Sequence, residues 1–214
     1  MSDVRQDIRI RFSKQGDIRF ISHHDLMRLF ERAVRRADLP VAVSGGHNPR
    51  PRISLPMALA LGLAGRNEVA DIVLARWVRP DEVRSRLQAE LPSGIDILSA
   101  EVIPSSASRQ PQELAYLVPL LPGSGLTEAR LAELLARDSV VVERTRKDQT
   151  FPVDVRPFVK ALRLGSGHLQ MLLSYTDKGT ARPQEVLQAL GCREAHDYRA
   201  SAIERTHVRI QSSV

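Results

Sequence analysis

Two helix signals that begin with proline, one in each half of the chain, most strongly constrain its fold. The segments RPDEV (79–83) and RPQEV (182–186) each follow a strand-like stretch and open a short amphipathic helix. Proline is favoured at the first position of a helix, because its fixed φ suits the helix and its missing N–H needs no partner there. The similarity of these two segments predicts that both halves of the chain repeat one α+β pattern.

Apolar periodicity around these signals predicts a βαββαβ order in each half. The elements of the first half are a strand hairpin (8–21), a helix (23–37), a strand near residue 53, a strand (69–78), a helix (80–91) and a strand (95–103). Those of the second half are a strand (115–120), a helix (127–137), two strands (140–146 and 169–175), a helix (183–190) and a strand (200–210). The predicted fold class is α+β, with two tandem ferredoxin-like domains at 1–104 and 112–214 joined by the polar linker 104–111.

The first predicted hairpin carries arginines on one face. If residues 14–16 form a three-residue loop with Gly16 at positive φ, Arg11 lies opposite Arg19 and beside Arg9. Like charges side by side destabilise a pair of strands. The cluster therefore requires an acidic neighbour or an anionic ligand.

Positive charge is concentrated near the start of the chain. Between Arg5 and Arg52 there are 11 basic and 5 acidic residues, a balance of +6 that equals the formal charge of all 214 residues. Only four of the 31 basic residues are lysine, and guanidinium groups suit bidentate phosphate contacts. Arginine usage can also reflect genomic base composition, and this alternative stays open.

A helix with one basic face is predicted to start after Ser22. Ser22 and Asp25 match the reciprocal capping pattern. At 100° per residue, the arginines at 28, 32, 35 and 36 fall within an arc of about 100°, with His24 at its rim. The apolar residues on the other side are Leu26, Leu29, Phe30, Ala33 and Ala37. A basic face that is merely solvated is the simplest interpretation of such a helix.

The loop that follows strengthens the anion-binding interpretation. Gly45 and Gly46 can expose successive backbone amides, and the prolines of the NPRPR segment (48–52) hold an extended chain that points Arg50 and Arg52 the same way. A plain turn before the next strand is the alternative. The candidate anion-binding or nucleic-acid-binding residues are Arg9, Arg11, Arg19, Ser22, His24, Arg28, Arg32, Arg35, Arg36, Gly45, Gly46, Asn48, Arg50 and Arg52.

Several classes of protein are excluded or disfavoured. One cysteine, Cys192, cannot form an internal disulfide or a cysteine-built zinc or iron–sulfur site, so no metal or cofactor is expected on this chain. Trp77 lies in a strand-like run and is predicted to be in the core. The longest apolar run (55–65) is too short for a membrane span, and the N-terminus lacks a secretory signal pattern, so a cytoplasmic protein is expected.

Two motif blocks resemble a known family. The blocks are RIRFSKQGDIRFISHHDLMRLFERAVRRADLP and SGGHNPRPRISLPMALALG, and they resemble the bacterial radical SAM-linked protein family, a domain found alone or at the C-terminus of radical SAM proteins. His24 and His47 replace the leucine and phenylalanine usual in that family. The resemblance implies a radical SAM partner protein that supplies the iron–sulfur cluster and S-adenosylmethionine.

These observations predict a non-catalytic accessory module that binds structured RNA, or another phosphate-rich substrate, for the radical SAM partner. One alternative is a metal-independent ribonuclease, in which His23 or His24 acts near an RNA 2′-hydroxyl. The other alternative is a protein-interaction module that docks the radical SAM partner. No catalytic residue is assigned from the sequence.

Overall fold

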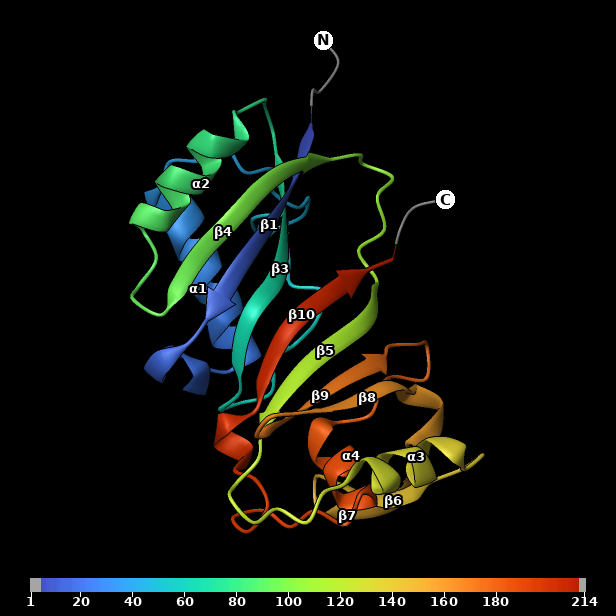
Figure 1. Cartoon of the computed structure of the whole chain (residues 1–214). Coiled ribbons are helices and arrows are strands. Elements are labelled where there is room, and N and C mark those ends of the chain that lie inside the picture. The colour runs from blue at the N-terminus through green and yellow to red at the C-terminus, as the bar shows by residue number, and fades with distance from the viewer. Residues whose placement is uncertain (1–4, 212–214) are drawn as a thin grey trace. The chain divides into compact units, whose positions relative to one another are not determined.

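The chain has an α+β structure made of two units, and a computed structural model describes residues 5–211 (Figure 1). Among these residues, unit 1 runs to Gln110 and also takes in Ile210 and Gln211, whereas unit 2 is Pro111–Arg209. The division falls at the end of the polar stretch 104–111. No helix in the described part of the chain is long and apolar enough to cross a membrane.

Unit 1 is an antiparallel sheet with two helices. Its elements are β1 (Gln6–Lys14), the 3-10 helix η1 (Gly16–Phe20), α1 (His23–Arg36), β2 (Ile53–Ser54), β3 (Ala64–Leu74), α2 (Pro80–Ala89) and β4 (Ile95–Ile103). The strand order is β4-β1-β3-β2. Both α-helices lie on one side of this sheet (Figure 1).

The core of unit 1 follows from the alternation of side chains along β1. Ile8, Ile10 and Phe12 are buried and pack in one cluster with residues of α1 and α2, including Phe30 and Leu87. The rings of Phe12 and Phe30 meet edge to face, with centroids 5.0 Å apart. The intervening residues of β1, among them Asp7 and Arg9, therefore face the other side of the sheet.

The predicted hairpin at 8–21 is wrong. β1 pairs with β3 and β4, and the chain after Gly16 turns into η1 instead of a return strand. Lys14 accounts for this turn, since its side chain is almost fully buried and its Nζ donates to the carbonyl oxygens of Arg19 (3.3 Å) and Ile21 (3.0 Å). The carbonyls of Arg19 in η1 and of Ile21 just after it thus satisfy the buried ammonium group.

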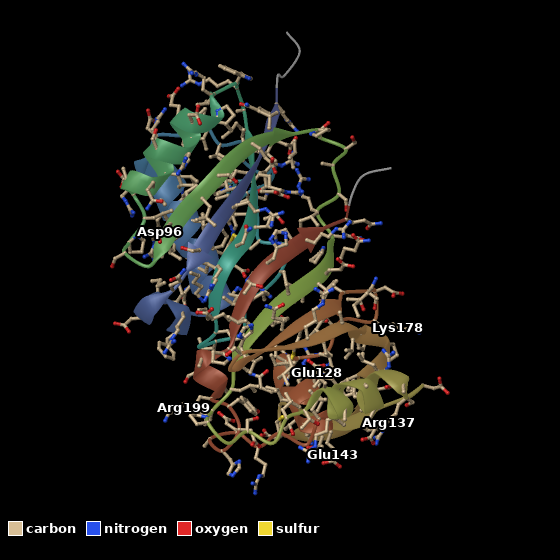
Figure 2. All side chains as sticks on the ribbon, viewed as in Figure 1. Asp96, Glu128, Arg137, Glu143, Lys178 and Arg199 are labelled. Carbon is tan, nitrogen blue, oxygen red and sulfur yellow. The ribbon has the colours of Figure 1, made fainter. Side chains whose placement is uncertain are left out.

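Unit 2 is also an antiparallel sheet with two helices, and it has an additional hairpin. Its elements are β5 (Pro111–Pro119), α3 (Glu128–Ala136), β6 (Val141–Arg146), β7 (Gln149–Asp154), η2 (Arg156–Phe158), β8 (Val159–Gly165), β9 (His168–Ser174), α4 (Pro183–Ala189), η3 (Ala200–Ala202) and β10 (Glu204–Ile210). The strand order is β10-β5-β9-β8, and β6 with β7 forms a separate two-stranded sheet. Glu128 at the start of α3 and Arg137 just beyond its end are exposed (both are labelled in Figure 2).

A partly buried ion pair connects the β6–β7 hairpin of unit 2 to α4. Arg144 on β6 donates from Nε and from one terminal nitrogen to the carboxylate of Glu185, at 2.6 and 2.7 Å. Glu185 also accepts from the backbone N–H of Arg182 at the start of the helix. The hydrogen bonds that Arg144 donates to Glu185 raise the pKa of its guanidinium above the ordinary value.

All four predicted α-helices are present, and Pro80 and Pro183 start α2 and α4. The strands β7 and β8 were not predicted. The β6–β7 turn has Lys147 and Asp148 at positive φ (48° and 63°). An Asn-Gly or Asp-Gly pair usually occupies these positions, so the sequence carried no clear signal of this hairpin.

Candidate anion-binding site

The start of α1 is fixed by Ser22. The Ser22 hydroxyl oxygen accepts from the backbone N–H of Asp25 (3.1 Å) and donates to the Asp25 carboxylate (2.7 Å). This confirms Ser22 as the predicted N-cap and His23 as the first residue of the helix. The Asp25 carboxylate accepts from the Ser22 hydroxyl, whereas in a reciprocal capping box it would accept from the Ser22 backbone N–H. The cap and the buried residues Leu26 and Phe30 set the rotation of the helix, so that the side chains of Arg28, Arg32, Arg35 and Arg36 are exposed.

The loop after α1 is closed by hydrogen bonds at its base. The N–H of Ser44 donates to the carbonyl of Arg50 (2.8 Å), and the N–H of Arg50 donates to the Ser44 hydroxyl (3.1 Å). Gly46 has a φ of +104°, a conformation that favours glycine. Gly45 and Gly46 are exposed at the tip of this loop.

The helix and the loop enclose a hollow of about 580 Å³, here called the α1 hollow. Its lining residues are His24, Met27, Arg28, Glu31, Arg35, Asn48, Pro49 and Arg50. Three guanidinium groups and one carboxylate line it, so it is positively charged. Within residues 5–211, the side chains of Arg35 and Arg50 have no ion-pair partner. The structure thus brings the basic helix and the NPRPR loop together.

A second hollow of about 550 Å³ lies on the other flank of α1, against the end of α2. Arg28 lines both hollows and lies 3.8 Å from the Asp25 carboxylate at an exposed position. Arg32 lines the second hollow only. Arg36 lies there too, but its Nε is 2.7 Å from the Glu90 carboxylate, so its charge is already compensated. The open basic ridge is therefore Arg28, Arg32 and Arg35.

Arg9 is not part of this constellation. It lies directly opposite Asp71 in the β1–β3 pair, and its Nε and one terminal nitrogen donate to that carboxylate at 2.8 and 2.9 Å. The same terminal nitrogen also donates to the carbonyl of Ser108. The arginine cluster was predicted to require either an acidic neighbour or an anionic ligand. For Arg9 the structure shows the acidic neighbour, Asp71.

Arg11 and Arg19 also lie outside the α1 hollow. Burial, followed by the nearby charge of Arg9, lowers the pKa of the Arg11 guanidinium below its ordinary value. Arg19 belongs to η1 and lies over the ring of Phe20, 4.8 Å from its centroid. The face predicted for the hairpin therefore does not form.

Arg52 does not point the same way as Arg50, contrary to the prediction. Its N–H donates to the carbonyl of Ala42 (2.7 Å) and its carbonyl accepts from Val73 (3.0 Å), so it is held like a strand residue beside β3. It lines a third hollow of about 460 Å³, which also contains Asp7, Asp71 and Arg109. In a regular strand, residues two apart such as Arg50 and Arg52 lie on the same face. A proline-rich segment has about three residues per turn instead, so residues two apart need not point the same way.

Histidine contributes one ring to the α1 hollow, that of His24. The ring of His23 is beside it, with centroids 6.2 Å apart. His47 is exposed in the loop and is not among the residues that line the hollow. Residues 5–211 contain no group of three or more His, Cys, Asp or Glu side chains placed to hold a metal ion.

Trp77 was predicted to lie in the core, and this prediction is wrong. The side chain is 62% exposed, in the loop between β3 and α2. β3 ends at Leu74, before the apolar pattern does. Arg76 and Arg79, which flank Trp77, are the signal in the sequence that this part of the run is a surface loop.

Two solved structures that resemble the chain are remote from it in sequence. The crystal structure of a Cbf5-Nop10-Gar1 complex is 8% identical, with a TM-score of 0.47 over 94% of this chain, which spans about half (48%) of that chain. An unknown protein from Galdieria sulphuraria is 15% identical, with a TM-score of 0.29, and the match covers 99% of this chain and 100% of that chain. Likenesses this low have no bearing on function.

No curated protein matches the chain. A family model described as "uncharacterized protein conserved in bacteria (DUF2344)" matches residues 7–183, which include the whole α1 hollow. The chain therefore belongs to this bacterial family, DUF2344.

Proposed function

We propose that this protein is a non-catalytic accessory module that binds RNA, or another phosphate-rich substrate, for a radical SAM partner enzyme. The observation that carries the proposal is the α1 hollow, where Arg28, Arg35 and Arg50 come together from two segments of the chain. Guanidinium groups held near one another repel, and a bound phosphate both relieves this repulsion and matches their planar geometry.

The other arginines of unit 1 support this choice of site. Arg9 is paired with Asp71, Arg36 with Glu90, and Arg86 with Glu82, at 2.7 to 3.0 Å. These side chains are occupied in holding strands and helices together. Arg9, Arg36 and Arg86 are therefore not available to a ligand, whereas Arg35 and Arg50 of the α1 hollow have no ion pair within residues 5–211.

The proposed partner follows from the resemblance to the radical SAM-linked family. A radical SAM enzyme needs a cysteine-bound iron–sulfur cluster, and this chain has a single cysteine, which is buried. A division of labour is consistent with this composition: the partner supplies the cluster and the chemistry, and this chain holds the substrate.

We also infer that both units are ferredoxin-like. The strand orders β4-β1-β3-β2 and β10-β5-β9-β8 correspond position by position, with a helix after the first and third strand of each set. In unit 2 the β6–β7 hairpin is then an insertion between α3 and the second strand of the set, β8. A duplication would explain why the similar segments RPDEV and RPQEV start corresponding helices in the two units.

The salt dependence of RNA binding tests this proposal. Titration of a short, labelled RNA hairpin, followed by fluorescence anisotropy from about 0.05 to 0.3 M KCl, is expected to give a log–log slope of about −2 to −4. This slope corresponds to phosphate contacts from the three or four arginines of the ridge and loop. Absence of binding at the lowest salt, or affinity independent of salt, would contradict the proposal.

The same samples test the ribonuclease alternative, which draws some support from the position of His24 in the α1 hollow. RNA recovered after incubation with a chelator is expected to keep its full length. Cleavage that persists in chelator and is lost on His24→Ala would replace the binding proposal by the catalytic one.

A further inference from the structure

The loop between β3 and α2 exposes the chain's only tryptophan. Trp77 is 62% exposed, although tryptophan carries a large apolar surface that is usually mostly buried. Its neighbours do not extend it into an apolar patch, since Val78 is buried and Arg76 and Arg79 are exposed. A single exposed ring between two exposed arginines does not make up the contiguous apolar patch that is typical of a protein–protein interaction site.

The backbone that carries Trp77 is anchored by a buried side-chain amide. Gln6 is 4% exposed, and its Oε1 accepts from the N–H of Val78 (2.8 Å) while its Nε2 donates to the carbonyl of Val78 (3.1 Å). On the other side of the loop, the N–H of Ala75 donates to the carbonyl of Pro40 (2.7 Å). The ring is therefore presented from a fixed backbone, which lowers the entropy lost when a ligand binds.

The charges beside Trp77 favour an anionic ligand. In the part of the chain that the structure describes, neither Arg76 nor Arg79 has an ion-pair partner for its side chain. Two acidic residues follow at the start of α2, and one of them, Glu82, is paired with Arg86 at 3.0 Å. Arg76 and Arg79 flank Trp77 in the sequence and are exposed, so both charges belong to the same surface segment as the indole.

We propose that Trp77 is a stacking platform for a nucleobase of single-stranded RNA, and that Arg76 and Arg79 contact the phosphates on either side of that base. The proposal rests on RNA as the ligand in the proposed function, but it uses residues outside the α1 hollow. Stacking on an exposed aromatic ring is tolerant of base identity, because every base has a π-face. Arginines beside the ring add binding energy through contacts with the phosphates of the RNA backbone.

The fluorescence of the protein reports this site alone, because Trp77 is the only tryptophan. Titration with unlabelled single-stranded RNA is expected to quench the tryptophan emission, while anisotropy of a labelled copy of the same RNA reports total binding. Inorganic polyphosphate, which has phosphates and no bases, is expected to bind without quenching. Quenching by RNA but not by polyphosphate would show that the base stacks on Trp77 and that binding there is more than attraction between opposite charges.

Substitution of Trp77 tests how much the aromatic ring itself contributes to RNA binding. Trp77→Leu is expected to weaken binding of single-stranded RNA about 10-fold and to leave polyphosphate affinity unchanged. Phe151→Leu is the matched control, since Phe151 is an exposed ring in unit 2 and its loss is expected to change neither affinity. Both residues are exposed, so far-UV circular dichroism is expected to be the same for both variants.

The two proposals fail in different ways. RNA binding seen by anisotropy, with unchanged Trp77 emission and full affinity in Trp77→Leu, overturns the stacking site and leaves the proposed function standing. Absence of RNA binding overturns both. Quenching that persists in Arg35→Glu with Arg50→Glu, at undiminished affinity, supports the stacking site and removes the α1 hollow.

Discussion

Replacing Arg35 and Arg50 by glutamate is expected to weaken RNA binding by about 100-fold or more at about 0.1 M KCl. The two guanidinium groups line the α1 hollow from opposite sides, and each has an exposed side chain with no ion pair among residues 5–211. Reversing both charges removes two phosphate contacts and adds repulsion. The fold is expected to be unaffected, because neither side chain stabilises another element.

A control with the same change of charge is available in unit 2. Arg146 and Arg199 are exposed, Arg199 near the start of η3 (Figure 2), and their replacement by glutamate also lowers the formal charge by four, from +6 to +2. This variant is expected to lose less than about 3-fold in affinity, through long-range attraction alone. Anisotropy titrations of both variants give the comparison. Equal losses would mean that RNA responds to net charge and not to the α1 hollow.

Asp71→Leu is expected to destabilise unit 1 by about 3–5 kcal/mol, the typical cost of leaving a buried charge without its partner. The side chain of Asp71 is 1% exposed and that of Arg9 is 10% exposed, and they are joined by two hydrogen bonds. Without Asp71, the guanidinium of Arg9 keeps the carbonyl of Ser108 but loses its counter-charge. Arg109 loses its 3.4 Å ion pair with Asp71 but keeps the one with Asp7.

Urea unfolding, followed by circular dichroism and by the emission of Trp77 in unit 1, measures this loss. The double variant Arg9→Met with Asp71→Leu is expected to recover most of the stability, since apolar pairs of similar volume often replace a buried ion pair at little cost. If the single and double variants are equally destabilised, the loss comes from packing and not from the unpaired charge. Arg35→Glu with Arg50→Glu is expected to unfold at the urea concentration of the unsubstituted protein.

Local patterns predicted α1 and its exposed ridge correctly because the information lies within one helical turn or two. Ser22 and Asp25 are three residues apart, and their hydrogen bond fixes where the helix begins. The apolar stripe with Leu26 and Phe30 then determines which arginines are exposed. The sequence also indicated that the NPRPR loop and α1 act together, and Asn48, Pro49 and Arg50 do line the α1 hollow.

Errors arose where the deciding partner is far away in the sequence. Arg9 was indistinguishable from a surface arginine, because Asp71 lies 62 positions further along the chain. The return strand of the hairpin had the right alternation, but the buried Lys14 ammonium recruits the carbonyls of η1 instead. Trp77 continued an apolar run, but the chain there is a loop whose backbone is held at Val78 by the side-chain amide of Gln6, 72 positions away. In each case a tertiary contact outweighed a local preference.

Photocrosslinking of the protein to RNA that contains 4-thiouridine, followed by mass spectrometry of the linked peptides, tests the central claim most directly. We expect crosslinked residues in α1 and in the loop 44–52, around Arg28, Arg35 and Arg50, in addition to any at the stacking site proposed for Trp77. Crosslinks confined to residues 111–209, or crosslinks in α1 that persist unchanged in Arg35→Glu with Arg50→Glu, would contradict the claim that RNA binds in the α1 hollow.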